Sequence, residues 1–568
     1  MEAGENNVDD STNTKNKIRH AAILAIPLLL ALLTYLPALK YPVLSGWDDQ
    51  VYVINAAPRL ACSWSNVSHW FSRPIHGCYL PLTMLTYMLD MALWELAPWG
   101  CHLQNIFWHM ACVAGVFMCA RKLGAAPVLS AVVASFFAIH PQRVESVVWI
   151  SERKDVVCGA FYFWSAYLYL SADPAPKGWR RRAASLLLFA AALLAKPMAV
   201  SLPLVLLLLD LAKDGVERPN FLDFIKKRRF AGLVPHAILA ALFCPVTYAA
   251  HKTLGTLHSS AIGAPRQIAI AIRNVAWYSL KTFVPGLPSP IHPRVSFDRM
   301  EILWIVLFYC GLGLAAYTLR RFSKRGFRIL LLFYAAFAIS LVPVVGLVPF
   351  GFIDYADRYS YIPSAILWIM TACLASTIPT PPKRTLRVLT VGAALYAAGL
   401  LTATSLYEPA WRSVYSLHKR ACAIPRPNEM ALEFLADLEI GRGDWKAVYE
   451  LSARIRSARE PWMSKEDFNK IRQKADYLKA VALARSGHWR RAVPIFEKLR
   501  GEYRGTTPRD YRRWADYKTT LSMLTAFYNA TGDKTAAAKT GLELIGVLKR
   551  EGSAPRNMPA KKIERLKP

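Results

Sequence analysis

The chain has 568 residues, of which 54% are hydrophobic, and its 70 lysines and arginines against 39 aspartates and glutamates give a formal net charge of +31. Residues 20–405 contain many apolar stretches long enough to cross a hydrocarbon core, whereas residues 407–568 contain none, which excludes a fully water-soluble protein. A basic balance can indicate nucleic-acid binding. Here the cations cluster in loops between apolar stretches, where topology and anionic lipid explain them better, so no nucleic acid is predicted as a partner.

The chain begins with a polar segment, residues 1–20, and continues into an apolar run at residues 21–39. The run is too long for a signal peptide and lacks a clear small-residue cleavage site, so we interpret it as a retained first membrane helix. The cations before it are Lys15, Lys17 and Arg19. By the positive-inside rule they place the N-terminus in the cytoplasm, and the following loop, residues 40–100, outside.

The sequence predicts an all-α membrane domain over residues 21–405 with about eleven spans. Cationic loops between alternate spans are predicted to lie inside, among them Arg121-Lys122, Lys177 with Arg180–Arg182, and Lys226–Arg229. The predicted spans are residues 21–39, 103–120, 126–141, 156–172, 183–197, 198–212, 231–250, 301–319, 328–349, 360–378 and 386–405.

One segment, residues 266–284, decides the topology of the second half. It is half apolar and is interrupted by Arg266, Arg273 and Lys281. A charge in the middle of a membrane span costs about 2.5–3.5 kcal/mol, and a span here would force Arg320–Arg325 outside. We therefore predict an interfacial or re-entrant helix on the outer side, with an ordinary twelfth span as the alternative.

The last part of the chain, residues 407–568, is predicted to be a helical domain outside the cytoplasm. Three stretches each show a helical pattern, a turn with glycine and a second helical pattern, which is typical of tetratricopeptide repeats. They are residues 431–455, 475–503 and 517–549. Such repeats stack into a concave surface that holds a peptide or protein. The alternative is a plain helical cap without a ligand.

Asp48 and Asp49 directly follow the first span, at the predicted outer surface. An ionised carboxylate there can take a proton from an attacking hydroxyl, which is general base catalysis. Side chains of adjacent residues diverge, so one acid can act as the base while the other orients it or the loop. The sequence leaves open which acid is the base, and a solvated turn is the structural alternative.

A second group of charged residues lies between the third and fourth predicted spans, within residues 136–155. Arginine and lysine on the outer side run against the topology rule, and both suit a phosphate held beside lipid. Anchoring by local ion pairs is the alternative. The candidates for binding the phosphate or the sugar are His140, Glu145, Glu152, Arg153, Lys154 and Asp155.

A third group enters the tenth predicted span. Asp357 and Arg358 lie there among three tyrosines, and they fit a phosphate clamp or a structural ion pair equally well. Lys196, which precedes Pro197 at the outer edge of another span, is interpreted as a hinge.

The cysteines show no metal-binding spacing. Cys62 and Cys78 share the first outer loop, where a disulfide and two free thiols are both plausible. No second acid cluster requires a divalent metal, so no metal site and no cofactor are predicted.

Several motifs, in order, resemble those of the transmembrane O-mannosyltransferases that target cadherins, and still more those of their bacterial relatives with tetratricopeptide tails. The first is Trp47-Asp-Asp-Gln-Val-Tyr52 in the first outer loop. The others are Pro81-Leu-Thr with Leu89-Asp90, His102-Leu-Gln-Asn105 with His109, Phe137-Ala-Ile-His-Pro141, Val144-Glu-Ser-Val147, Glu152-Arg-Lys-Asp155, Leu194-Ala-Lys-Pro-Met198, and Ala356-Asp-Arg-Tyr-Ser-Tyr-Ile-Pro363.

The resemblance implies a GT-C glycosyltransferase, which transfers a sugar with inversion from a polyprenyl-phosphate carrier to an acceptor outside the cytoplasm. The family's essential acid lies in the first outer loop and corresponds to Asp48 or Asp49. The expected partners are the polyprenyl-phosphate-linked sugar, membrane lipid, and an acceptor protein or glycan. The expected location is a bacterial inner membrane, with the site and the tail on the periplasmic side.

Two functions from other classes remain as alternatives. A transporter or flippase of a lipid-linked sugar would also need outer cations, but it would show an internal repeat of the span pattern. A non-catalytic scaffold anchored by its spans would not need eleven of them. Within enzymes, a ligase or polymerase that moves whole glycans is a third alternative.

Overall fold

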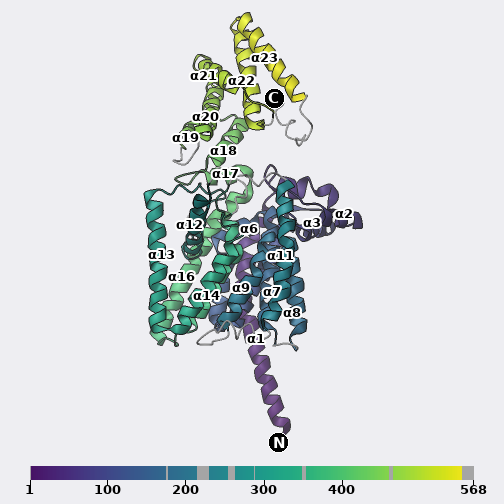
Figure 1. The fold of residues 1–568 in the computed structure, drawn as a ribbon, viewed down its shortest axis with the longest axis vertical. Helices are drawn as coiled ribbons and strands as arrows, with labels where there is room; N and C mark the ends of the chain where they lie inside the picture. Colours follow the sequence, from purple (N-terminus) through teal and green to yellow (C-terminus); the bar gives the residue numbers. More distant parts are fainter. Residues whose placement is uncertain are drawn as a thin grey trace. The chain divides into compact units, whose positions relative to one another are not determined.

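The structure is a computed structural model that describes residues 2–173, 177–213, 229–253, 263–286, 288–347, 353–458, 465–508 and 510–552. The chain divides into two compact units, Met1–Arg420 and Ala421–Pro568. Within the described residues the regular elements are helices, apart from an isolated bridge between Ile75 and Cys78 (Figure 1). The predicted all-α class is thus confirmed.

The first unit is a bundle in which a helix occupies each of the eleven predicted spans. α7 packs between α4 and α8, α1 packs on α4 and α5, and α14 packs on α9 and α15. The long helices are α1 (Glu2–Tyr35), α4 (Pro98–Lys122), α5 (Pro127–Ile139), α7 (Arg153–Ser171), α8 (Trp179–Ala195), α9 (Leu202–Lys213), α11 (Arg229–Thr253), α12 (Ala264–Phe283), α13 (Arg299–Phe322), α14 (Lys324–Leu341), α15 (Tyr361–Ala375) and α16 (Lys383–Tyr407).

Five helical segments are long and apolar enough to cross a membrane by themselves, within the part of the chain that the structure describes. They are Arg19–Lys40, Pro98–Lys122, Gly232–Lys252, Arg299–Phe322 and Lys383–Arg412. α5 and α8 are shorter, because a proline follows closely on the last residue of each of them. α5 stops before His140-Pro141, and α8 stops before Lys196-Pro197, since proline disfavours a helical conformation at the residue before it.

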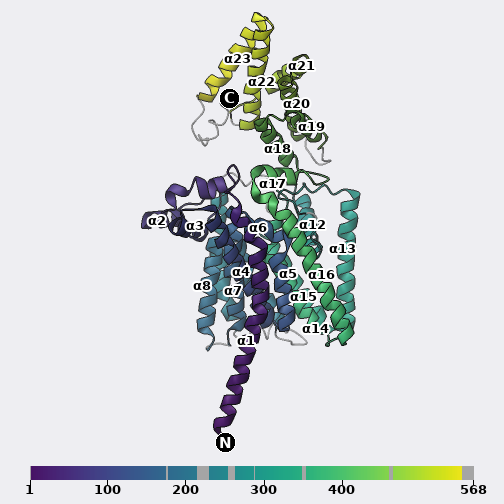
Figure 2. The same cartoon turned by 180° about the vertical axis from the view of Figure 1, so that it is seen from behind.

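The broken helix ends gather at one end of the bundle, which we call the site end. It holds the loop between α1 and α4 and the short helices η4 (Pro141–Arg143), α6 (Val144–Val148), η5 (Ile150–Glu152), η6 (Pro197–Ser201) and η7 (Asp357–Ser360). Both views show α2, α3 and α6 at this end (Figures 1 and 2). The opposite end carries the cations of the α4–α5, α8 and α13–α14 connections, most of them exposed, and the positive-inside rule predicts that this end faces the cytoplasm. The cations predicted at 226–228 lie outside the described residues, as do positions 348–349 of the ninth predicted span.

The loop after the first span folds into a small layer of its own at the site end. It contains the π turn η2 (Gln50–Ile54), η3 (Ala57–Arg59), α2 (Trp64–Ser72) and α3 (Pro81–Trp94). Its core is formed by buried residues that include Tyr52, Trp70 and Met84, packed with Ile150 of η5. Cys62 and Cys78 are free thiols in this structure.

The helix of uncertain topology, α12, enters the bundle from the site end. Near its start, Arg266 donates to the carbonyl of Val295 (3.0 Å), and at its end Phe283 contacts Trp368 and Tyr396, near the middle of α15 and α16. Arg273 is buried and paired with Glu301 (2.9 Å). Whether α12 stays on the outer side in a bilayer remains a prediction.

The second unit contains three helical hairpins, as the sequence predicts. Their helices are α18 (Glu429–Arg442) with α19 (Trp445–Ser457), α20 (Lys465–Arg485) with α21 (Trp489–Tyr503), and α22 (Tyr511–Ala530) with α23 (Lys534–Gly552). Gly443, Gly487 and Gly532 form the turns with φ of +73°, +82° and +80°, a left-handed conformation that glycine adopts at little cost. Each helix packs on the next along the chain, which is the logic of a tetratricopeptide-like array.

The topology can be tested with single cysteines at Arg321, between α13 and α14, and at Lys534, in the tail. All native cysteines except the exposed Cys62 are replaced by serine, and intact cells are treated with a membrane-impermeant maleimide. With eleven spans, Lys534→Cys and Cys62 are labelled from outside, and Arg321→Cys reacts only after the membrane is opened. Labelling of Arg321→Cys and Lys534→Cys from the same side contradicts the eleven-span topology.

Candidate active site

The two acids of the first loop sit in a tight turn between α1 and α2. α1 continues into η1 (Leu36–Lys40), and a turn at Gly46 (φ +90°) leads into η2. The backbone carbonyl of Asp48 accepts hydrogen bonds from Val51 (2.8 Å) and Tyr52 (3.0 Å). These bonds fix the backbone of the turn. The carboxylates of Asp48 and Asp49 lie in different surroundings.

Asp49 is a structural tether. Its side chain is 1% exposed. One carboxylate oxygen accepts from the Leu44 N–H (2.9 Å), and the other accepts from the backbone N–H (2.9 Å) and the hydroxyl of Ser151. Burial raises the pKa of Asp49, and the hydrogen bonds from Ser151 and Leu44 counter this. Asp49 thus joins the first loop to η5 and has no free lone pair facing solvent.

Asp48 is different, because its carboxylate is partly exposed and makes no side-chain hydrogen bond or ion pair within the described residues. It lies within electrostatic range of Lys154 and Tyr52. A partly exposed, unpaired carboxylate beside a cation is able to accept a proton from a bound hydroxyl. The structure therefore gives the two adjacent acids distinct surroundings, which the sequence left open.

Three cations converge on Glu152. Its carboxylate lies 2.8 Å from Lys154 Nζ, 3.6 Å from Lys196 Nζ and 3.6 Å from Arg358 Nε. The three cationic side chains are 10–13% exposed, so each reaches the surface of the site. Burial alone would raise the pKa of Glu152, but the three cations together lower it below its ordinary value. Glu152 is therefore ionised at neutral pH and holds the cations at one point.

Lys196 and Arg358 each have a second acidic partner besides Glu152. Lys196 pairs with Asp155, which also accepts from the Ser146 hydroxyl (2.9 Å). Arg358 pairs with Glu145 through its guanidinium, and its backbone N–H donates to the same carboxylate (2.9 Å). Burial raises the pKa of Glu145 to about 7, although Arg358 opposes the shift. We call Glu145, Glu152, Lys154, Asp155, Lys196 and Arg358 the charged cluster.

Arg153 lies apart from the charged cluster, although the sequence grouped it with Lys154 as a candidate for binding the phosphate or the sugar. It is completely buried, and its guanidinium pairs with Asp90 and donates to Asn105 Oδ1 (2.7 Å) and the Cys101 carbonyl (2.7 Å). It also lies over the ring of Tyr87, 4.4 Å from its centroid. Its donors are thus turned toward α3 and α4, and Arg153 fastens the first outer loop to the bundle instead of facing a substrate.

Two further predicted residues also lie outside the charged cluster. His140 is buried, its Nδ1 accepts from the Gln142 N–H (3.2 Å), and its ring packs near Trp368. Asp357 precedes Arg358 in η7 and pairs with His292 (3.1 Å). Both residues shape the turns that carry the charged cluster.

Lys196 belongs to the charged cluster, although the sequence did not select it as a candidate for binding the phosphate. The sequence suggested a hinge because Pro197 follows, and the structure shows a cation directed at Glu152 and Asp155. The sequence does contain a signal for this residue. Lys196 lies at the predicted outer end of a span, which runs against the positive-inside rule in the same way as Lys154 does.

No three metal-ligating side chains gather around a common point among the described residues. The carboxylates of the charged cluster are instead each paired with a lysine or an arginine. The three cations are able to bind an anionic group such as a phosphate. The anion would either replace Glu152 as their partner or bind beside it.

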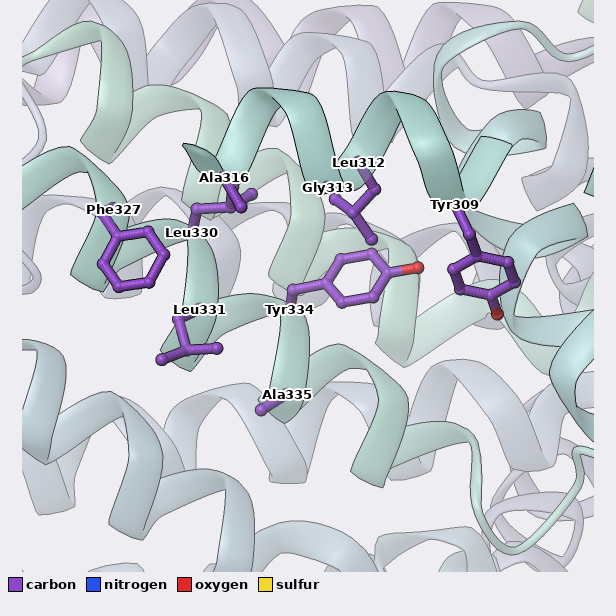
Figure 3. Close-up of a pocket in the computed structure, with 9 residues that line it drawn as sticks. All are labelled: Tyr309, Leu312, Gly313, Ala316, Phe327, Leu330, Leu331, Tyr334 and Ala335. Carbon is purple, nitrogen blue, oxygen red and sulfur yellow. The ribbon is translucent and has the colours of Figure 1, made fainter. Parts of the chain in front are cut away.

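An apolar groove lies elsewhere, between α13 and α14, with an empty volume of about 720 Å³. Gly313, Ala316 and Ala335 are among the small residues that line this space, with Tyr309 at one end, Phe327 at the other and Tyr334 between them (Figure 3). Its lining contains none of the predicted site residues. The groove suits a lipid chain, not acid–base chemistry.

Stretches of this chain are similar in sequence to curated protein O-mannosyl-transferases. Tmtc2 of Drosophila melanogaster is 31% identical over 177 residues, which are 30% of this chain and 18% of that protein. TMTC3 of Homo sapiens is 31% identical over 129 residues, 22% of this chain and 14% of that protein. TMTC4 of Homo sapiens is 30% identical over 149 residues, 22% of this chain and 20% of that protein. The resemblance seen in the motifs is confirmed, and the matches span only about a fifth of the relatives' length.

No family model matches the chain. Among solved structures, ArnT from Cupriavidus metallidurans bound to undecaprenyl phosphate aligns over 81% of this chain and 88% of its own, with 13% identity and a TM-score of 0.37. The archaeal oligosaccharyltransferase AglB from Archaeoglobus fulgidus aligns over 70% of this chain and 56% of its own, with 12% identity and a TM-score of 0.38. TM-scores this low do not establish a shared fold.

The role of Arg153 can be tested by stability. Asp90→Ala leaves the Arg153 guanidinium buried without its carboxylate, which costs about 3–5 kcal/mol. We expect a large fall in the melting temperature of the purified protein in detergent. Asp173→Ala removes an exposed pair with Arg181 (3.8 Å), worth about 1 kcal/mol or less, and serves as the control. Equal melting temperatures for the two variants would contradict the structural role of Arg153.

Proposed function

We propose that this protein, whose sequence resembles the protein O-mannosyl-transferases, is an inverting glycosyltransferase. It moves a sugar from a polyprenyl-phosphate carrier to an acceptor hydroxyl of a protein on the non-cytoplasmic face of a bacterial inner membrane. The observation that carries the proposal is the Asp48 carboxylate, which is unpaired among the described residues and lies within electrostatic range of Lys154, at the end of the bundle where three cations converge on Glu152.

Asp48 is the general base in this reaction. The acceptor hydroxyl attacks the anomeric carbon as Asp48 takes its proton, and the bond from that carbon to the phosphate oxygen breaks. The carboxylate of Asp48 is partly exposed and can be reached by an acceptor hydroxyl, as a general base must be. Asp49, which accepts three hydrogen bonds, instead holds the loop in position.

Lys154, Lys196 and Arg358 bind the phosphate and stabilise the charge that develops on it as it leaves. Such cations act most strongly where water is excluded and where they are held in place before the reaction. Glu152 provides this order, because it neutralises part of the repulsion among three cations that would otherwise spread apart. The carrier chain extends into lipid, and no divalent metal is required in this scheme.

The helical tail is proposed to hold the acceptor protein, since stacked helix pairs present a broad surface for a peptide. This assignment agrees with the names of the relatives, which are protein O-mannosyl-transferases.

The base assignment predicts different results for the two acids. Asp48→Asn keeps the shape of the side chain but removes the proton acceptor, so the rate of sugar transfer falls about 100- to 10,000-fold while the protein remains folded. Asp49→Asn disturbs the link to Ser151 and Leu44, so it lowers the melting temperature and leaves measurable transfer. Activity is measured with a polyprenyl-phosphate sugar in detergent. Full activity of Asp48→Asn would refute the assignment.

The phosphate site predicts that Lys154→Gln and Lys196→Gln each lower kcat/KM for the donor about 10- to 100-fold, the loss expected for a charge-assisted hydrogen bond. Lys177→Gln, an exposed lysine at the opposite end of the bundle, is the control and keeps the wild-type value. Melting temperatures are compared, because each variant also leaves Glu152 with one cation fewer. An unchanged kcat/KM in both site variants would exclude these lysines from donor binding.

A further inference from the structure

The segment that follows the last membrane helix packs onto the active-site loop. It consists of η8 (Glu408–Arg412) and α17 (Val414–Ala421). Trp411 is 2% exposed and Leu417 and His418 are fully buried. Trp411 and Leu417 belong to the hydrophobic core of the bundle, the same core against which Trp47 packs. We call residues 408–420 the junction segment.

The junction segment contacts the loop that carries Asp48 through aromatic rings. His418 meets Trp47 edge-on, with ring centroids 5.2 Å apart and planes at 85°. On its other side Trp47 lies 5.9 Å from Trp149, and Trp149 stacks on Trp411 at 5.4 Å with planes at 28°. Trp47, the residue immediately before Asp48, is therefore enclosed by Trp149 and by His418 of the junction segment.

A second contact lies earlier in the same loop. The guanidinium of Arg412 sits over the ring of Tyr41, 5.8 Å from its centroid. The carbonyl of Tyr41 in turn lies 3.2 Å from His102 Nε2 of α4. The junction segment thus contacts the loop at two points on the N-terminal side of Asp48.

The junction segment is itself held in one conformation by local hydrogen bonds. Ser413 and Ser416 cap each other, with the Ser413 N–H donating to Ser416 Oγ (3.0 Å) and the Ser416 N–H donating to Ser413 Oγ (3.1 Å). His418 Nδ1 lies 2.8 Å from the Val414 carbonyl, and Arg420 donates to the Pro288 carbonyl (3.2 Å). This segment is a fixed support and not a loose linker.

Asp48 needs such support, because its own carboxylate has no partner among the described residues. Its place is set by its neighbours: by the hydrogen bonds of Asp49 on one side and by the packing of Trp47 on the other. A shift of about 1 Å in a catalytic group can cost on the order of 100-fold in rate.

We propose that Trp411 and His418 are positioning residues that hold Trp47, and through it Asp48, in the geometry for proton transfer. The inference rests on the proposed function of Asp48. Trp411 acts through Trp149, whereas His418 touches Trp47 directly. Because residues 421 onward form the helical unit, the segment that positions the base also connects that unit to the bundle.

The test is a double-mutant cycle in the full-length protein between Trp411 and Asp48. Trp411→Ala is expected to lower kcat about 10- to 100-fold with little change in the donor KM, and Trp411→Phe, which keeps a ring, restores most of the rate. In the Asp48→Asn background Trp411→Ala causes no further loss, because there is no base left to position. Residual rates are followed by long single-turnover incubations.

His418→Ala is expected to behave like Trp411→Ala, and Lys419→Ala, the exposed neighbour in α17, is the control with the wild-type rate. A merely structural role would lower kcat by the same factor in both backgrounds, or lower only the melting temperature, and either result overturns the inference. Full activity of Asp48→Asn alone would instead overturn the proposed function, together with the inference that depends on it.

Discussion

The site depends on the convergence of Lys154, Lys196 and Arg358 on the carboxylate of Glu152. Buried cations at a membrane edge are costly unless they are paired. The three cations and the carboxylate come from four separate parts of the chain. α7, the α8–η6 turn and η7 bring the cations, and η5 brings Glu152. The prolines that end α5 and α8 begin η4 and η6, two of the short helices at this end. The same breaks that shorten the membrane helices therefore build the polar end of the bundle.

The second feature is the division of roles between two adjacent carboxylates. Asp49 is bound on both oxygens and ties the first loop to η5, next to Glu152. Asp48 is unpaired among the described residues and lies within electrostatic range of Lys154, so in the proposed mechanism Asp49 holds the turn that carries Asp48. The ion pair of Arg153 with Asp90 fastens the rest of the loop to the bundle. The junction segment, which follows the last membrane helix, packs against the loop at Tyr41 and Trp47. Hydrogen bonds, an ion pair and aromatic packing thus hold the loop whose proposed base, Asp48, has no partner among the described residues.

Much of this architecture followed from the sequence. A helix lies at each span that the apolar stretches predict, and Gly443, Gly487 and Gly532 lie at the turns of the tail. Apolar runs and turn glycines are both local signals, which can be recognised in the sequence alone. The surroundings of Asp48 and Asp49 were not predictable, since the partner Ser151 lies 102 residues away in the chain. For the same reason Arg153 and Lys154, adjacent in sequence, could not be separated into a structural and a site cation, and Lys196 was interpreted as a hinge.

The central claim is that the cations gathered on Glu152 hold the phosphate of a polyprenyl-phosphate donor next to Asp48. The most direct measurement is an experimental structure of the full-length protein with a non-hydrolysable donor analogue in a lipid nanodisc. The account predicts phosphate density in contact with Lys154, Lys196 and Arg358, with the anomeric carbon facing Asp48. Phosphate density at the opposite end of the bundle, or beside Arg153 and Asp90, would contradict it.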